Sequence, residues 1–239
     1  MEYSSEFFRI QLRFARKVVE VSRQSLESAL LHYTNLYIRF GLGWDLDAAN
    51  PIWQEYLKGL NQAKDAINWT YQFYLKQQEG TISQANPSSF GCFSYTLLTD
   101  NKIRLHFRNN EMAEHSPLSR DQIKIRLAEL AAMFAHVRQN VGTPANVVGA
   151  SWLYNIETYR RLFPPAYLAS ARVEHGDFAF LPLWGQFVNR SGRLKADLIE
   201  RFLECLASQQ SLEGLERCFP FQVLHLECSI EEFYQFYKV

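Results

Sequence analysis

From Glu2 to Phe40 the chain contains no proline and no glycine, and apolar residues recur in this stretch at helical spacing. The pattern predicts one long helix, or two helices with a slight break between them. Gly41 and Gly43 then end the helical stretch, because glycine adopts the left-handed conformation that terminates helices at little steric cost.

A second helix is predicted from about residue 51 to Gln78. Asp47 and Asn50 can cap its N-terminus, and Pro51 occupies the first turn, where a missing N–H does no harm. Two long helices joined by a short loop predict an antiparallel helical hairpin. Its aromatic residues are typical of a core or of a dimer interface, and those considered for self-association are Phe7, Phe14, Trp53, Tyr56 and Tyr71.

The composition changes between Gly80 and Gly91, where Ser, Asn and Pro are typical of a linker. Beyond it, residues 93–98 and 103–107 predict a β-hairpin around a polar turn. In the second run, Ile103 and its alternate neighbours share one face, whereas Arg104, His106 and Arg108 share the other. We therefore expect a helical region over residues 1–80 and an α/β domain with a mixed sheet over residues 91–239.

The remaining elements alternate between helical and β-type patterns. Helices are predicted after Ser119, over 155–162, over 193–208, over 212–218 and after Ser229. Strand-like runs cover 147–153, 170–173, 178–188 and 221–228. The fold class is α+β, a long N-terminal helical hairpin followed by a mixed sheet flanked by helices.

The composition excludes several classes of protein. Hydrophobic residues make up 47% of the 239 residues, which is ample for a core. Lys plus Arg equals Asp plus Glu at 25 each, so we expect no nucleic-acid partner. The four cysteines lack C-x-x-C spacing and no signal-peptide pattern opens the chain, which favours reduced thiols in a cytoplasmic protein. No apolar run is long enough to predict a membrane span.

Familiar catalytic and nucleotide-binding signatures are missing from the sequence. The six histidines are scattered without metal-ligand spacing, so we expect no metal site. His106 lies in a predicted strand, where it can be satisfied within the sheet or act as a general base. Ser151 follows an apolar strand, where it can cap the next helix or contact a ligand. Arg160, Arg161 and Arg172 can be solvated or can bind phosphate through their planar donor groups.

Several short motifs occur in an order that resembles a known family. They are the run from Ile103 through His106 to Phe107, the segment Ser116-Pro-Leu-Ser119, a helix ending near His136, the segment Ser151-Trp-Leu153, and the Pro-Pro and Ala169-Ser170 stretch before Phe178. In this respect residues 104–188 resemble the C-terminal half of bacterial two-part GNAT-like acyltransferase homologues.

The resemblance implies an acyltransferase-like protein that binds a CoA thioester. His106 would then be the base, Ser151 or Tyr154 a polar contact, and Arg160, Arg161 or Arg172 would meet the phosphates of CoA or acyl-CoA. The alternative is a non-enzymatic assembly or adaptor protein whose N-terminal helices pair in a homodimer or with a partner. That alternative requires an exposed apolar stripe on those helices.

Overall fold

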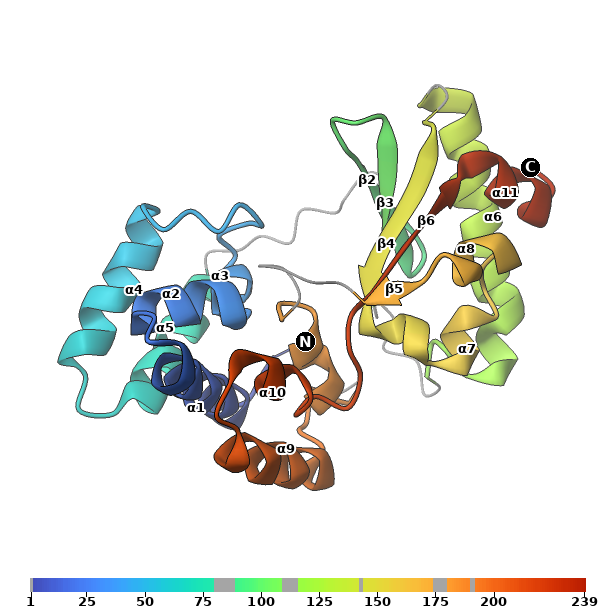
Figure 1. The fold of residues 1–239 in the computed structure, drawn as a ribbon. Helices are drawn as coiled ribbons and strands as arrows, with labels where there is room; N and C mark the ends of the chain where they lie inside the picture. The colour runs from blue at the N-terminus through green and yellow to red at the C-terminus, as the bar shows by residue number, and fades with distance from the viewer. Residues whose placement is uncertain (1, 80–88, 109–115, 142–143, 174–179, 190–191) are drawn as a thin grey trace. The chain divides into compact units, whose positions relative to one another are not determined.

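The computed structural model describes residues 2–79, 89–108, 116–141, 144–173, 180–189 and 192–239 (Figure 1). The chain divides into two units: unit 1 comprises residues 1–83 and 175–222, and unit 2 comprises residues 84–174 and 223–239. This division differs from the predicted ranges 1–80 and 91–239, because residues 175–222 group with the N-terminal helices.

Unit 1 is built from helices. They are α1 (Ser5–Ser22), α2 (Leu26–Tyr33), α3 (Leu36–Arg39), α4 (Pro51–Gln62), α5 (Ala66–Glu79), the 3-10 helix η3 (Leu183–Phe187), α9 (Ala196–Ser208) and α10 (Leu212–Glu216). The predicted N-terminal helical segment is present, but it contains five helices, where the two predicted alternatives gave two or three.

Local signals explain two of the breaks in the N-terminal segment, between α1 and α2 and between α4 and α5. Arg23 ends α1 in the left-handed conformation, at a φ of 60°, and the hydroxyl of Ser25 then caps α2. Asp65 begins α5, because its carboxylate accepts hydrogen bonds from the amides of residues 67 and 68 at 2.9 and 3.0 Å. Asn50 caps α4 as predicted, by accepting from Ile52 and Trp53.

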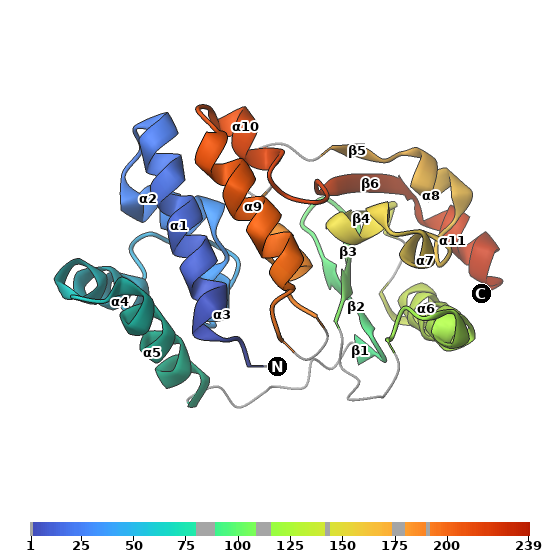
Figure 2. The same ribbon diagram turned by 90° about the horizontal axis from the view of Figure 1, so that it is seen from below.

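The aromatic core of unit 1 explains why residues 175–222 belong with the N-terminal helices. The Phe14 ring on α1 lies 5.3 to 5.9 Å from the rings of Phe180, Trp184, Phe202 and Phe219, ring separations that are favourable for aromatic pairs. Figure 2 shows α9 and α10 alongside α1.

The predicted strand over 178–188 is wrong where the structure describes it. Pro182 precedes the 3-10 helix η3, and a proline cannot donate the hydrogen bond that a central strand requires. The apolar run instead supplies side chains to the core, among them Trp184, whose indole N–H donates to the Tyr33 carbonyl at 3.2 Å. Phe178 and residue 179 lie outside the described ranges.

The expectation that all thiols are reduced is also wrong. Cys205 on α9 and Cys218, which follows α10, form a disulfide. Their Cα atoms are 5.3 Å apart, a normal separation for such a bond, because α10 returns the chain to α9. Cys92 and Cys228 are not part of a disulfide.

Unit 2 contains a six-stranded mixed sheet in the order β1-β2-β3-β4-β6-β5. The strands are β1 (Ser89–Phe90), β2 (Phe93–Leu97), β3 (Lys102–Phe107), β4 (Asn146–Ser151), β5 (Arg172–Val173) and β6 (Leu224–Ser229). Only the β3–β4 pair is parallel, and the other pairs are antiparallel. The predicted hairpin of β2 and β3 and the predicted late strand β6 are confirmed.

The helices of unit 2 lie on one side of the sheet in Figure 1. They are η1 (Arg120–Gln122), α6 (Ile123–Asn140), η2 (Trp152–Asn155), α7 (Glu157–Arg160), α8 (Pro165–Ala169) and α11 (Ile230–Tyr237). The amide of Glu231 donates to the Ser229 hydroxyl, so Ser229 caps α11 as predicted. Together the two units confirm the α+β fold class.

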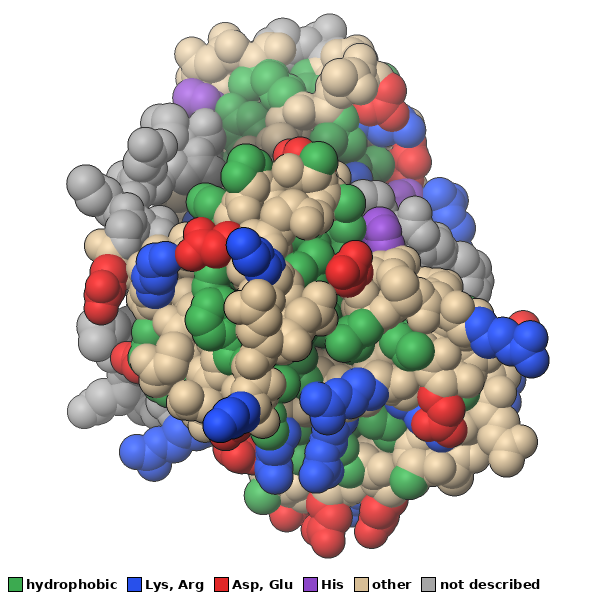
Figure 3. Space-filling view, turned by 90° about the vertical axis from the view of Figure 1, so that its left-hand side faces the viewer, with side chains coloured by type: hydrophobic (Ala, Val, Ile, Leu, Met, Phe, Trp, Pro, Cys, Tyr) green, Lys and Arg blue, Asp and Glu red, His purple; other side chains and the backbone are tan. Residues whose placement is uncertain are grey.

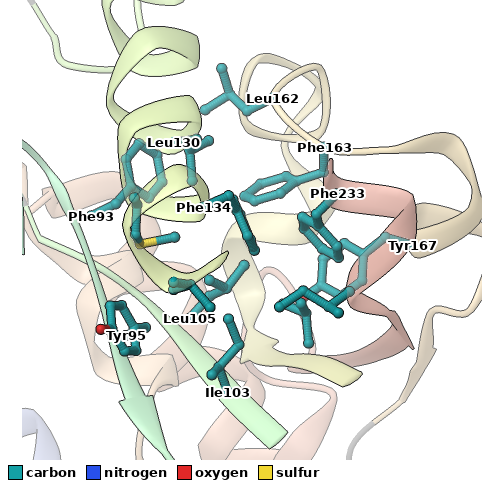
Figure 4. Packing of buried hydrophobic residues seen from close by; sticks show 14 of the residues in the cluster. Phe93, Tyr95, Ile103, Leu105, Leu130, Phe134, Leu162, Phe163, Tyr167 and Phe233 are labelled. Atoms are coloured by element: carbon teal, nitrogen blue, oxygen red, sulfur yellow. The ribbon is translucent and has the colours of Figure 1, made fainter. Parts of the chain in front are cut away.

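One hydrophobic core joins these helices to the sheet (Figure 4). Phe134 of α6 and Phe233 of α11 stack with ring centroids 4.6 Å apart, and they belong to the same core cluster as the strand residues Ile103, Leu105 and Leu226. Every helix among the described residues is too short or too polar to span a lipid bilayer.

Candidate functional site

The second face of the unit 2 sheet carries polar and charged side chains. Successive strand residues point to opposite faces, so the residues that alternate with the core residues point away from the core. They are Ser94 and Thr96 on β2, Lys102, Arg104 and His106 on β3, Asn146, Val148 and Ala150 on β4, Arg172 on β5, and His225 and Glu227 on β6. We call this set the polar face.

His106 lies on the polar face between two arginines. Its Nε2 atom is 2.9 Å from the hydroxyl oxygen of Thr96, and the two share a hydrogen bond across the β2–β3 pair. Partial burial and then the nearby charges of Arg104 and Arg108 lower the pKa of His106 to about 4. The imidazole is therefore neutral at physiological pH. Its hydrogen bond within the sheet agrees with the first of the two roles considered for His106, and the second role, as a general base, stays a prediction.

A second group of polar residues connects three strands of the same face. The Lys102 ammonium lies 3.0 Å from the carboxylates of both Asp100 and Glu227, and the Asn146 amide donates to Glu227 at 2.7 Å. Partial burial alone would raise the pKa of Glu227, but the hydrogen bonds from Lys102 and Asn146 outweigh it and lower that pKa. The Lys102–Glu227 ion pair therefore reaches across β4, which lies between β3 and β6.

The structure does not bring Ser151 and Tyr154 to His106. The Ser151 hydroxyl accepts from the amide of Leu153 at 3.2 Å, so it caps η2. Tyr154 is buried in the core, and its hydroxyl shares a 2.9 Å hydrogen bond with that of Tyr167. Burial raises the pKa of Tyr154 well above its usual value, so the phenol stays protonated. Tyr154 therefore lies on the core face, whereas His106 points from the opposite face.

The three arginines predicted to hold phosphates also separate. Arg161 pairs with Glu157 at 3.1 Å, and Arg160 is exposed at the end of α7. Arg172 lies opposite His225 on the edge strand β5, and so on the polar face. Three strand spacings separate β5 from β3, roughly 14 Å at the usual spacing. Of the six predicted site residues, His106 and Arg172 share one surface.

Sequence reasoning missed the role of Lys102, Asn146 and Glu227 in arranging this surface. Strand alternation already placed Lys102 on the face of Arg104 and His106. Nothing in a single sequence, however, shows that β4 lies beside β3 and that β6 lies beside β4. Among the described residues, no three His, Cys, Asp or Glu side chains gather as ligands for a metal ion.

Comparisons with known proteins return no relative of this chain. No protein-family model matches it. Neither the curated proteins nor the solved structures contain a match. The resemblance to GNAT-like acyltransferase homologues therefore stays a prediction.

Proposed function

We propose that unit 2 binds a phosphate-bearing anion on its polar face and that His106 exchanges a proton with this ligand. The observation that carries the proposal is the position of His106, hydrogen-bonded to Thr96 and flanked by Arg104 on β3 and by Arg108 directly after β3. Neither arginine forms an ion pair with any residue that the structure describes. Guanidinium groups provide planar donors that match carboxylates and phosphates.

Anion binding and proton uptake are coupled at such a site. The positive charges of Arg104 and Arg108 contribute to the lowered pKa of His106. A negative charge bound beside them offsets this effect and raises the pKa of the imidazole toward the working pH. By linkage, the ligand then binds more tightly at lower pH, where His106 more readily takes up a proton.

CoA thioesters are the first class of anion to test, because the family resemblance implies them and their phosphates match arginine donors. Only His106 acts as the acid or base here, because the Ser151 hydroxyl caps η2 and the Tyr154 hydroxyl is bonded to Tyr167 in the core. Arg172 lies on β5, and a ligand long enough to cross the polar face would meet it there.

The test is thermal unfolding with and without millimolar CoA, acetyl-CoA or inorganic phosphate at pH 5.5 and pH 8. A ligand that binds only the folded state raises the unfolding midpoint by mass action. We expect CoA to raise it in the natural protein, with the larger shift at pH 5.5. The double variant R104A/R108A should lose that shift.

Arg160→Ala is the matched control, because Arg160 is an exposed arginine of unit 2 that does not belong to the polar face. It should keep the full ligand-induced shift. Equal shifts in R104A/R108A and in the natural protein would overturn the proposal, and so would the absence of a shift with all three anions.

The alternative, self-association through the N-terminal helices, stays a prediction without a supporting observation. Phe7, Phe14, Trp53 and Tyr56 are buried in the core of unit 1, and Tyr71 is partly buried. These side chains therefore do not form the exposed apolar stripe that such an interface requires.

A further inference from the structure

Unit 1 contains a small hollow that is separate from the polar face. Its volume is about 190 Å³, and it lies where the middle of α1, the start of α2 and the α4–α5 connection meet. It is lined by Leu12, Arg16, Leu26, Leu60, Asn61, Ala63, Lys64 and Ala66.

The lining has an apolar floor and a basic rim. Leu12 is buried, and Leu26, Leu60 and Ala66 are partly buried, whereas Arg16 and Lys64 are exposed. No acidic side chain belongs to this lining. Basic side chains also lie beside hydrophobic ones on the face shown in Figure 3.

The two cations at the rim are available to a ligand. Neither Arg16 nor Lys64 forms an ion pair with a described residue, whereas the neighbouring Lys17 is already paired with Glu20 at 2.7 Å. An anion bound at the rim would therefore meet a guanidinium and an ammonium group without displacing a carboxylate of the protein.

The volume sets the size of the apolar part of the ligand. Sites for drug-sized molecules measure about 300–1,000 Å³, whereas a dry apolar cavity of about 150 Å³ holds a benzene ring. We propose that this hollow binds a small monocarboxylate with an apolar body of about six carbon atoms. The body lies on Leu12, Leu26 and Leu60, and the carboxylate meets Arg16 and Lys64.

Calorimetric titration of the full chain with hexanoate tests the assignment, with hexan-1-ol and hexylamine as probes of the same length. We expect hexanoate to saturate one site at millimolar concentration. The uncharged hexan-1-ol and the cationic hexylamine should bind at least about fivefold more weakly. This factor corresponds to the loss of about 1 kcal/mol of charge interaction. Equal binding of all three probes would overturn the proposal, as would failure of hexanoate to saturate.

Two pairs of variants locate the site. Arg16→Ala and Lys64→Ala should each weaken hexanoate about fivefold. Arg13→Ala and Lys58→Ala are matched controls, because both are exposed on α1 and α4 but do not line the hollow. If the controls weaken hexanoate as much as the rim variants, the binding is non-specific charge attraction and the assignment fails.

A further variant separates the hollow from the polar face of unit 2. Ala63→Leu fills part of the hollow while it keeps both cations, so it should abolish hexanoate binding without lowering the unfolding midpoint. The variant R104A/R108A should leave hexanoate binding unchanged. If R104A/R108A loses hexanoate binding and Ala63→Leu keeps it, the carboxylate binds outside the hollow and the inference is wrong.

Discussion

Partial burial of His106, together with the charges of Arg104 and Arg108, makes the free energy of unfolding depend on pH. The unfolded imidazole takes up a proton near pH 6.5, but the folded one does so only near pH 4. Because the unfolded state binds the extra proton first, the free energy of unfolding falls as the pH drops from about 6.5 to about 4. For this partly exposed side chain we expect a loss on the order of 1 to 2 kcal/mol.

The variant His106→Gln should flatten that part of the stability curve, as measured by urea unfolding at several pH values. His136→Asn is the control, because His136 lies on α6 and not on the polar face. A variant curve that remains parallel to the natural one between pH 6.5 and pH 4 would show that another group carries the dependence.

Gly149 on β4 has no side chain, and the hydroxyl groups of the buried pair Tyr154 and Tyr167 occupy the space beside it. A Cβ added there would lie 2.2 Å from the hydroxyl oxygens of both Tyr154 and Tyr167. We expect Gly149→Ala to lower the free energy of unfolding by about 2 to 3 kcal/mol, because the methyl group overpacks the core and displaces a buried hydrogen bond. Urea unfolding measures the loss.

A combined variant identifies the cause of that loss. In the Y154F/Y167F background both hydroxyls are absent, and the nearest remaining neighbour of the alanine Cβ is the ring carbon Cζ of residue 154, at 2.9 Å. The additional cost of Gly149→Ala should then be clearly smaller than in the natural protein, and an unchanged cost would contradict the steric explanation.

Individual helices and strands could be predicted where a short-range signal decides them. Ser229 caps α11 as expected, and the alternation around Ile103 correctly assigned the faces of β3. The predicted strand over 178–188 is wrong because its apolar run contains Pro182, which a central strand does not accommodate. A break in the first helical stretch was one of the two predicted alternatives, but its position at Arg23 was not predicted, because arginine is not the usual glycine cap.

The cap of α4 allows a prediction for one element. The Asn50 carboxamide oxygen accepts hydrogen bonds from the amides of Ile52 and Trp53 at 3.0 and 3.3 Å. Asn50→Ala leaves both amides without this acceptor and should cost about 1 kcal/mol in the free energy of unfolding. Lys58→Ala, in the exposed middle of the same helix, should change it by less than about 0.5 kcal/mol. Equal effects of the two variants would show that the cap is not what stabilises the start of α4.

At the scale of the whole chain, the sequence identifies the types of element but not which distant segments meet. His106 was identified as a candidate because its strand alternates, and Arg172 because it is an arginine near other arginines. Their place on one polar face depends on β4 and β6 lying between them, which no local pattern encodes. The separation of Ser151 and Tyr154 from His106 has the same origin.

The division into units predicts how a fragment behaves. A chain of residues 1–83 alone lacks Phe180, Trp184, Phe202 and Phe219, which surround Phe14. We expect this fragment to show no cooperative thermal unfolding by circular dichroism. Adding a peptide of residues 175–222 should restore a cooperative transition. Cooperative unfolding of residues 1–83 alone would contradict this account of the core of unit 1.

The interrupted path of the chain through unit 1 has a consequence for its synthesis on the ribosome. The five N-terminal helices emerge well before residues 175–222. At about 5–20 residues per second, the nascent helices wait on the order of ten seconds for the aromatic side chains that complete their core. During that interval Phe14 and its neighbours are exposed to solvent. A chaperone that binds exposed apolar segments would therefore bind the nascent chain at this stage.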